Sequence, residues 1–534
     1  MGKRHKTHPG TGPVPATVIA PPVMQERQIL FGIALGLALA AALAFIALFL
    51  YVALSRIRHP FDLEWLEGSM VVHVQRVMEG KSLYVEPSLD FTCYQQQPLY
   101  YWTAALASIP FGVGYFSARL VSVLSTLGTF LLLFLLVRRE TKSSVFGLIA
   151  AGAYAAAFGP VGDWFDLARV DSLMVFWVVA GLYAVRCARP SVWTSVATAL
   201  LFLLAFFTKH PAAFVFAGAA AYLFLLNWRQ GILTGVVFAA GAGIAVLLLD
   251  RATEGWYTFY IFRLLRDISH IETNYLGFWR ANLLVTAPIW PLAVLAFLCG
   301  ELLGWRDRRR LFFPLVLGSA FAESWIARLQ PGSVLNVDMP VYAVMAMTLP
   351  VALHATARCL LQSSDRRVRL LAPVMVVVVA AQFGALLYNP APKIPTKADV
   401  AAGWKLIDYL RAVPGDVFIP CSDYYAALAG KKTFAHAMST TDILSGSDET
   451  LKKKLRDELF DALKQKKFAA VVLPVNDFGF SAAAIKFNYR EIPFRLFEND
   501  RVFQPVVRNV ECRPSRVFVP AQPKAGLGLL RDYQ

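Results

Sequence analysis

Long apolar runs alternate with short polar segments along most of this chain, and the pattern predicts a bundle of membrane-spanning helices. A helix needs about 20 predominantly apolar residues to cross a bilayer. Runs near this length, the fourth to sixth of them short and closely spaced, lie at 29–54, 118–137, 144–159, 170–187, 191–208, 211–227, 231–249, 282–304, 310–327, 339–357 and 369–388. We therefore predict a polytopic α-helical protein of about 11 spans, whose termini lie on opposite sides of the membrane.

Basic residues between the runs predict the orientation, because cytoplasmic loops of membrane proteins are enriched in Lys and Arg. With a cytoplasmic N-terminus, one face collects Lys3, Arg4, Lys6, Arg138, Arg139, Lys142, Arg186, Arg189, Arg229, Arg306, Arg308, Arg309, Arg310, Arg358, Arg366, Arg367 and Arg369. The opposite, outer face then receives loops 55–117 and 250–281 and the chain after residue 389.

Three domains follow from the change of composition along the chain. Residues 1–28 are basic and Pro-rich and predict a disordered cytoplasmic tail, and residues 29–390 form the transmembrane part. Segments 63–80 and 98–120 are amphipathic, which suits helices lying in the membrane interface. In residues 391–534, helix-like 401–413 and 448–467 alternate with strand-like 416–420 and 468–475, which predicts a small extracytoplasmic α/β domain.

The composition excludes several classes of protein. A chain that is 57% hydrophobic and 16% charged is too apolar for a soluble globule. The net charge of +16 is explained by the clusters between spans, so we predict no nucleic-acid partner. The six cysteines show no CxxC pair. A disulfide between Cys421 and Cys512 is one alternative, and it requires an oxidising compartment. We predict no metal site, although the loop acids leave a divalent cation as an open alternative.

The stretch FDLEWLEG follows the first span and supplies three acids, Asp62, Glu64 and Glu67. Glu64 and Glu67 are three residues apart and share a helix face, while Asp62 is placed to cap that helix. A carboxylate at the membrane boundary is a candidate general base. The alternative is a capped interfacial helix with solvated acids.

A second acidic stretch, GDWFDLARVDSL (162–173), opens the fourth span. The spacing of Asp163, Asp166, Arg169 and Asp171 predicts charge pairing along one helical turn. The helix dipole accounts for acids at a helix N-terminus. It explains Asp171 poorly, because an ionisable residue inside a span costs roughly 2.5–3.5 kcal/mol and usually faces a cavity. We therefore favour function for Arg169 and Asp171, with Asp166 in the same pocket.

Some basic residues lie on the predicted outer face and so depart from the concentration of basic residues on the cytoplasmic face. Lys209 and His210 separate two short spans and have no acid beside them in the sequence. These side chains suit the binding of an anion such as a lipid phosphate or, equally, snorkelling to the headgroups. The loop 251–280 joins aromatic residues to Arg263 and Arg266 and suits either a polyprenyl phosphate or anchoring in the interface. Asn336 precedes another span on the same face.

Several of these pieces together resemble the GT-C superfamily of polyprenyl-phosphate-sugar glycosyltransferases, nearest to its family 39 of protein mannosyltransferase and aminoarabinose transferase relatives. The likeness spans most of residues 55–340. Besides the acids after the first span and the aspartate/arginine stretch, it rests on VMEGKSLYVEP (77–87), QQPLYYW (96–102), FGVGYFSARLVSVLST (111–126), FTKH and NVDMP.

The resemblance implies a site on the outer face. The family's Asp-Glu pair, whose aspartate is the base, falls on Leu66 and Glu67, so Asp62 or Glu64 stands in for the missing aspartate. Asp171 matches the acid of the second outer loop. The implied roles are catalysis for Glu67, Asp62, Glu64 and Asp171, donor-phosphate binding for Lys209, His210, Arg169, Arg263 and Arg266, and pocket formation for Asp166, Tyr100 and Asn336.

The implied activity is transfer of a sugar from a polyprenyl-phosphate donor to a glycolipid, an envelope polysaccharide or a protein. The implied place is the periplasmic face of a bacterial inner membrane, with membrane lipids as further partners. Such a donor is already activated, so no nucleotide-binding motif is required. A lipid or solute transporter is the alternative, but transporters carry their charges near the midplane, and here the charges gather at one interface.

Overall fold

Helices form at every predicted apolar run. The structure is a computed structural model that describes residues 22–268, 276–330, 333–475, 482–492, 497, 501–507, 510 and 512–521. The helices at the predicted runs are α1 (Pro22–Arg56), α4 (Tyr115–Thr141), α5 (Ser144–Ala156), α6 (Asp171–Cys187), α7 (Val192–Thr208), α8 (Ala212–Leu226), α9 (Trp228–Ala252), α12 (Ile289–Leu303), α13 (Phe312–Arg328), α14 (Met339–Leu361) and α15 (Arg366–Ala385). The helical nature of these runs is confirmed.

Length separates these helices into two groups. Among the described residues, five helices are long and apolar enough to cross a membrane: Ile29–Arg56, Tyr115–Thr141, Trp228–Ala252, Leu335–Leu361 and Arg366–Ala385. A sixth span results if the π-helix η2 (Phe278–Val285) and α12, bent by 101° against each other, count as one. Helices such as α5, α7 and α8 are shorter. The figure of about 11 spans therefore stays a prediction.

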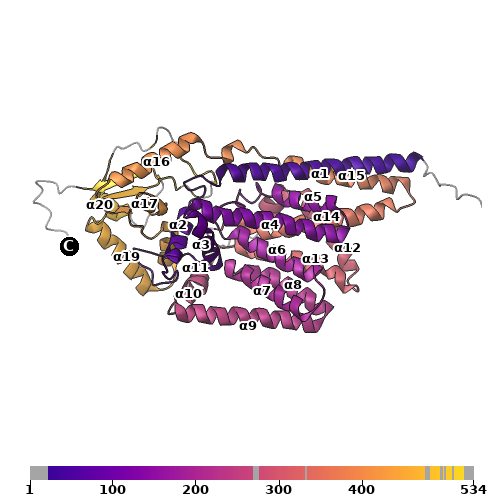
Figure 1. Cartoon of the computed structure of the whole chain (residues 1–534), viewed down its shortest axis with the longest axis horizontal. Helices are drawn as coiled ribbons and strands as arrows, with labels where there is room; N and C mark the ends of the chain where they lie inside the picture. The colour runs from indigo at the N-terminus through magenta and orange to yellow at the C-terminus, as the bar shows by residue number, and fades with distance from the viewer. Residues whose placement is uncertain are drawn as a thin grey trace, which may run out of the picture.

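The long helices run along the long axis of the molecule, with the C-terminal region beyond one end of the bundle (Figure 1). The bundle core is built from buried apolar side chains of α1, α4, α5, α6 and α14. The packing of α1 against α5 is close at Gly152, where an added Cβ would lie 2.3 Å from the Ala42 Cβ. Small residues of this kind allow helices to approach each other within a membrane.

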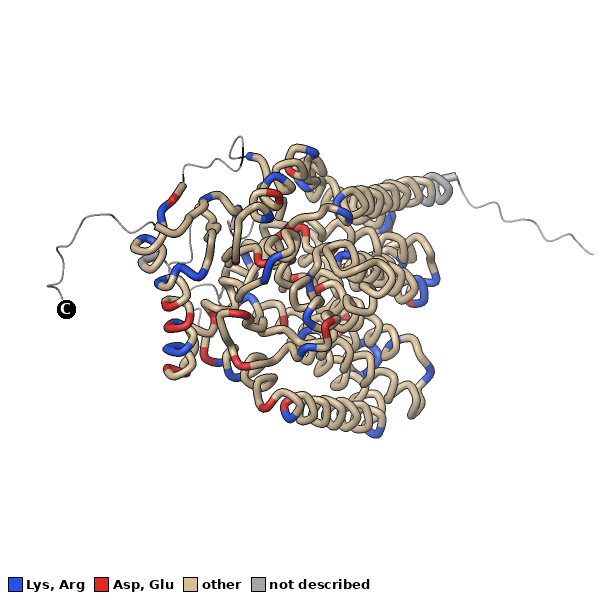
Figure 2. The backbone as a smooth tube through the Cα atoms, turned by 60° about the vertical axis from the view of Figure 1, so that its left-hand side comes forward, with Lys and Arg blue, Asp and Glu red and all other residues tan. Residues whose placement is uncertain are grey.

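One end of the bundle gathers the predicted cytoplasmic loops. Arg186 binds Glu140 through two hydrogen bonds of 2.8 and 2.9 Å and also donates to the Arg309 carbonyl at 3.1 Å. Arg308 donates to the Leu225 carbonyl at 2.7 Å. Figure 2 shows Lys and Arg at the helix ends farthest from the C-terminal region. The basic loops thus share one end, as the charge pattern predicts.

The opposite end carries the loops that the charge pattern predicts on the outer face. The first amphipathic segment forms α2 (Glu67–Met78), and the second is divided between α3 (Leu99–Phe111) and the start of α4. Gly112 ends α3 with a φ of 80°, a conformation that glycine adopts without strain. The predicted loop 250–281 contains α10 (Trp256–Thr258), the π-helix η1 (Phe259–Arg263) and α11 (Leu264–Ile268). Its residues 269–275 lie outside the described residues.

The C-terminal region contains a four-stranded sheet in the order β1-β2-β4-β3. β1 (Val417–Phe418) pairs in parallel with β2 (Ala470–Leu473), whereas β4 (Arg516–Pro520) is antiparallel to β2 and to β3 (Tyr489–Glu491), so the sheet is mixed. The helices of the region are α16 (Lys397–Ala412), α17 (Tyr424–Leu428), α18 (Ala437–Ser445), α19 (Glu449–Lys464) and α20 (Ala482–Asn488). The predicted helices 401–413 and 448–467 correspond to α16 and α19.

This region shares its core with the first outer loop. Phe61 packs its ring on Trp404, Tyr425 and Phe503, with centroids 5.4, 5.7 and 5.1 Å away. Cys421 is buried in the same core, and among the described residues no disulfide joins Cys421 to Cys512, so the disulfide alternative has no support here. At the other terminus, α1 begins at Pro22, before the predicted end of the tail at residue 28, and residues 1–21 lie outside the described residues.

Candidate active site

A cavity of about 780 Å³ lies between the outer end of the bundle and the C-terminal region. Its wall comes from the first outer loop, the α5–α6 loop, the α7–α8 turn, α13, the segment before α14, and α18. About half of the lining side chains are apolar. The charged and polar ones predicted from the sequence are Glu64, Arg169, Lys209, His210 and Asn336.

Lys209 and Asn336 are both held by Asp171 at the edge of this cavity. The Lys209 Nζ lies 2.7 Å from the Asp171 Oδ1, and the Asn336 amide donates to the same oxygen at 3.0 Å. Asp171 is fully buried at the first position of α6. Lys209 has no acid beside it in the sequence, and its partner comes from an earlier helix that the fold brings next to the α7–α8 turn.

Arg169 and Glu64 form a second charged pair on the cavity wall. The Arg169 guanidinium lies 3.4 Å from the Glu64 Oε2 and 5.0 Å from the centre of the Trp164 ring. Both charged side chains are buried, and both line the cavity. The pair places a carboxylate and a guanidinium side by side on the cavity wall.

The remaining aspartates of GDWFDLARVDSL bind cations from other parts of the chain. Asp166 accepts two hydrogen bonds of 2.7 and 2.5 Å from Arg56 at the end of α1. Asp163 pairs with Lys393 at 2.5 Å. Each pair joins segments far apart in the sequence, so the predicted pairing along one turn is wrong. Asp166 is buried in this ion pair and is absent from the lining of the cavity.

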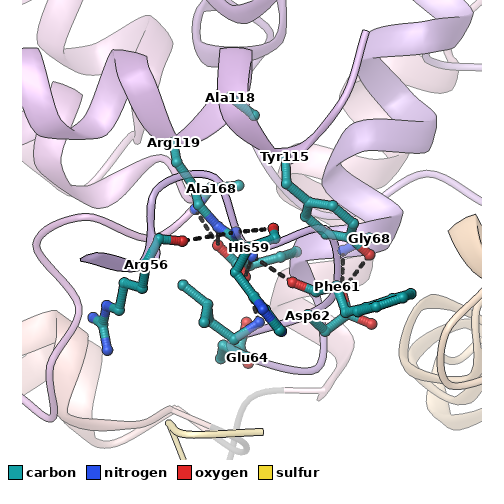
Figure 3. Close-up of polar contacts among 12 residues, drawn as sticks. Arg56, His59, Phe61, Asp62, Glu64, Gly68, Tyr115, Ala118, Arg119 and Ala168 are labelled. Carbon is teal, nitrogen blue, oxygen red and sulfur yellow. Dashed lines mark hydrogen bonds and ion pairs between the residues drawn. The ribbon is translucent and has the colours of Figure 1, made fainter. Parts of the chain in front are cut away.

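Glu67 is the centre of a buried network that joins α2 to α4. Figure 3 shows Arg119 and Ala168 of this network beside His59 and Phe61. Its two oxygens accept from Arg119 at 2.9 and 2.6 Å and from the backbone N–H groups of Ala168 and Leu63, each at 2.7 Å. Burial by itself raises the pKa of Glu67, but Arg119 and these hydrogen bonds hold it below its ordinary value. Arg119 also donates to the carbonyls of His59 and Phe61. Glu67 thus fixes the loop and does not line the cavity.

Asp62 lies in a different small space. Its Oδ1 accepts from the Tyr115 hydroxyl at 2.9 Å and from the Gly68 N–H at 2.7 Å. Burial, and then the charge of Glu67, raise the pKa of Asp62 to about 8. Asp62 and His59 line a cavity of only about 10 Å³, which has room for one water molecule and none for a sugar.

Three other predicted residues lie away from the large cavity. Tyr100 is buried and donates to the Ala118 carbonyl at 3.0 Å. Arg263 and Arg266 are exposed, and Arg266 lies 3.6 Å from Asp267. None of the three is among the residues that line the cavity in the described part of the chain.

The sequence prediction missed several charged residues of this end. Glu323 in α13 and Asp442 in α18 line the cavity, while Arg56 and Arg119 hold its supporting loops. A usable signal existed for Arg119 and Glu323, because both interrupt apolar helices and an ionisable residue inside a span usually has a polar partner or a functional role. Among the described residues, no group of three or more His, Cys, Asp or Glu side chains is suited to hold a metal ion.

Comparison with known proteins supports the same superfamily. Residues 95–250 match the model of the family described as dolichyl-phosphate-mannose-protein mannosyltransferase. The solved structure of ArnT from Cupriavidus metallidurans bound to undecaprenyl phosphate superimposes with a TM-score of 0.58 and 14% identity, covering 90% of this chain and 97% of that one.

The chain has an ArnT-like fold. The apo form of the Cupriavidus ArnT gives a TM-score of 0.56 with the same coverage. In sequence, the chain is 26% identical over 322 residues to the undecaprenyl phosphate-alpha-4-amino-4-deoxy-L-arabinose arabinosyl transferase of Pseudomonas paraeruginosa. That match covers 54% of each protein, so the chain spans about half the length of this curated relative. The resemblance to polyprenyl-phosphate-sugar glycosyltransferases predicted from the sequence is confirmed.

Proposed function

We propose that this chain is a membrane glycosyltransferase that moves a sugar from a polyprenyl-phosphate donor to an acceptor. The observation that carries the proposal is the convergence of a carboxylate, Glu64, and two cations, Arg169 and Lys209, on one cavity. The cavity lies at the end of the bundle opposite the basic loops. The ArnT-like fold and the undecaprenyl phosphate named with the Cupriavidus structure support a lipid-phosphate donor.

The proposed chemistry is a single displacement at the sugar. An acceptor hydroxyl or amine attacks the anomeric carbon, its proton passes to the Glu64 carboxylate, and the bond between that carbon and the phosphate oxygen breaks. The electron pair of this bond stays on the departing polyprenyl phosphate. Arg169, Lys209 and His210 line the side of the cavity where this negative charge is to be stabilised.

Among the three first-loop acids, the surroundings favour Glu64 as the base. All acceptor positions of Glu67 are directed at Arg119 and two backbone N–H groups, and Asp62 faces a space too small for substrate. Glu64 lies on the wall of the large cavity. Asp171 then acts through Lys209 and Asn336 as a positioning residue.

The proposed setting is the inner membrane of a bacterium, with the N-terminus in the cytoplasm and the cavity and C-terminal region in the periplasm. Acceptors of the proposed reaction are a glycolipid, an envelope polysaccharide or a protein. The clustering of basic loops at the other end of the bundle supports this orientation.

The test is donor turnover by the purified protein in liposomes. Polyprenyl-linked sugars extracted from the source cells are supplied with envelope acceptors, and released polyprenyl phosphate is measured by mass spectrometry. We expect turnover by the wild type and a loss of about 100-fold or more in Glu64→Gln, which is the usual contribution of a general base. Glu79→Gln, at an exposed site, is the matched control. Wild-type turnover that survives Glu64→Gln unchanged would contradict the assignment of the base, and lack of any turnover would contradict the proposed activity.

Transport is the second candidate function, and one observation favours it. The helix pair η2 and α12 is bent by 101°, and broken helices are common at transport sites. The liposome experiment separates the two functions, because a transporter moves its lipid or solute between leaflets without breaking the bond between sugar and phosphate.

A further inference from the structure

The cavity has a second wall, formed by one face of α13. Its lining residues are Glu323, Ile326, Ala327 and Gln330, in which Ile326 and Ala327 lie three and four positions after Glu323, and Gln330 lies four and three positions after them. Side chains at this spacing lie on one side of a helix. The face therefore presents two polar side chains, one from the interior of α13 and one from just beyond its end, to the same space.

A face of α18 in the C-terminal region completes this wall. Its lining residues are Met438, Thr441, Asp442 and Ser445, in which Thr441 and Asp442 lie three and four positions after Met438, and Ser445 lies four and three positions after them, so they share one side of the helix. The cavity is thus enclosed jointly by the bundle and the C-terminal region, each of which contributes one carboxylate, Glu323 or Asp442.

Within the described part of the chain, three side-chain oxygen atoms on this wall are buried without a hydrogen-bond partner. They are the Glu323 Oε2, the Gln330 Oε1 and the Thr441 Oγ1. Glu323 is 2% exposed, so its carboxylate is almost fully shielded from bulk solvent. Buried polar groups in folded proteins are nearly always hydrogen-bonded, and exceptions call for an explanation such as a missing ligand.

The charged side chains of the cavity wall also differ in whether they form ion pairs. Lys209 pairs with Asp171, and Arg169 pairs with Glu64. Among the described residues, neither Glu323 nor Asp442 forms an ion pair. The wall made by α13 and α18 is therefore rich in acceptors and acidic, which disfavours a phosphate and favours a group that donates hydrogen bonds.

We propose that Glu323, Gln330, Thr441 and Asp442 form a subsite that binds the hydrogen-bond donors, hydroxyl or ammonium, of the sugar on the lipid donor. The phosphate then lies toward Lys209 and Arg169. This inference rests on the proposed function, since it takes the ligand of the cavity to be a polyprenyl-phosphate-linked sugar. It gives the C-terminal region a direct part in substrate recognition.

The experiment compares ligands with and without a sugar. Dissociation constants of the detergent-purified full chain are measured for undecaprenyl phosphate, undecaprenyl phosphate-mannose and undecaprenyl phosphate-4-amino-4-deoxy-L-arabinose. We expect the wild type to bind at least one sugar-bearing lipid more tightly than undecaprenyl phosphate. We expect Glu323→Ala and Asp442→Ala each to raise the dissociation constant of that sugar-bearing lipid about tenfold or more. The dissociation constant of undecaprenyl phosphate should change by less than about twofold, because only the sugar contacts this wall.

Two kinds of control keep the result specific. Glu301→Ala in α12 and the exposed Asp408→Ala in α16 are matched variants away from the cavity and should leave all three constants unchanged. Melting temperatures confirm that each variant is folded, and Glu323→Gln and Asp442→Asn replace any alanine variant that is not. Glu323→Gln also separates the two donor chemistries: a hydroxyl keeps most of its affinity for the amide oxygen, whereas an ammonium loses about as much as in Glu323→Ala.

The outcomes are distinct. Equal weakening of undecaprenyl phosphate and of the sugar-bearing lipid would overturn the subsite, and so would unchanged binding of all three ligands. A wild type that binds the sugar-bearing lipids no more tightly than undecaprenyl phosphate would overturn it as well. If the wild type binds none of the three lipids, the proposed function itself fails, and the subsite fails with it.

Discussion

At the scale of single residues, the three carboxylates of the first outer loop differ in their surroundings. Glu67 is enclosed by Arg119 and two backbone donors, Asp62 by Tyr115 and Gly68, and only Glu64 lines the large cavity. The spacing of these acids in the sequence does not distinguish them. Their roles follow from which helix each one meets after folding.

Glu67 is predicted to stabilise the protein. In Glu67→Gln the Arg119 guanidinium stays buried without its charged partner, and breaking a buried ion pair in this way costs about 3–5 kcal/mol. We expect a clearly lowered melting temperature in detergent for Glu67→Gln. Glu64→Gln also removes the acid of a buried pair, but it should lower the melting temperature less, because Glu64 meets Arg169 through a single longer contact of 3.4 Å. The opposite order of melting temperatures would contradict the assignment of these two residues.

Asp62 is predicted to make stability depend on pH. Its folded-state pKa of about 8 exceeds the unfolded value of about 3.9, so the folded state holds the extra proton between these values. Stability from this group is present at low pH and falls as pH rises toward 8, by at most about 1.4 kcal/mol per pH unit. The melting temperature of Asp62→Asn, measured relative to that of the wild type, should therefore increase as the pH is raised from 5 to 9. A difference between the two proteins that is constant over this range would contradict the prediction.

At the scale of elements, ion pairs between distant segments position the site. Arg56 at the end of α1 holds Asp166, and Lys209 in the α7–α8 turn is held by Asp171 of α6. Both pairs fix the α5–α6 loop and the start of α6, which carry Arg169 to the cavity. A shift of this loop moves Arg169 away from Glu64.

The Arg56–Asp166 pair supplies the matching prediction. Asp166→Ala leaves a fully buried arginine unpaired and should cost about 3–5 kcal/mol. The double variant Arg56→Met with Asp166→Leu should recover much of this loss, because it removes both charges. Melting temperatures of the two variants test this. Equal destabilisation by both variants would indicate that the charges themselves are not the cause.

The helical runs and their common basic end could be predicted from the sequence because hydropathy and charge are local properties. The likeness to polyprenyl-phosphate-sugar transferases was also visible in short motifs. The ion-pair partners of Asp163, Asp166 and Lys209 could not be predicted, since each pair joins residues distant in the chain. Glu323 was hidden within an apolar run, and Asp442 lies in a region whose contact with the bundle has no signal in the sequence.

At the scale of the whole molecule, the C-terminal region and the first outer loop form one core. Phe61, Tyr425 and Phe503 pack together, and the N–H of Val507 donates to the carbonyl of Leu63 at 2.9 Å. A chain that ends at residue 390 therefore exposes this apolar surface. We expect such a truncated chain to elute as aggregate in size-exclusion chromatography. A monodisperse truncated protein would show that the shared core is dispensable.

The orientation in the membrane is tested by labelling in intact cells. In a chain whose exposed Cys299 and Cys359 are replaced by serine, Asp408→Cys in the C-terminal region should react with a membrane-impermeant maleimide. Ser191→Cys, in the exposed α6–α7 loop, should react only after the cells are opened. The reverse pattern would place the cavity on the cytoplasmic side.

The central claim is that the large cavity is the binding site of a polyprenyl-phosphate donor, and a cryo-electron microscopy structure with undecaprenyl phosphate tests it most directly. We predict phosphate density within hydrogen-bonding reach of Lys209 or Arg169, with the lipid tail leading from the cavity along the helices. Phosphate density at another place on the molecule, with this cavity empty, would contradict the claim.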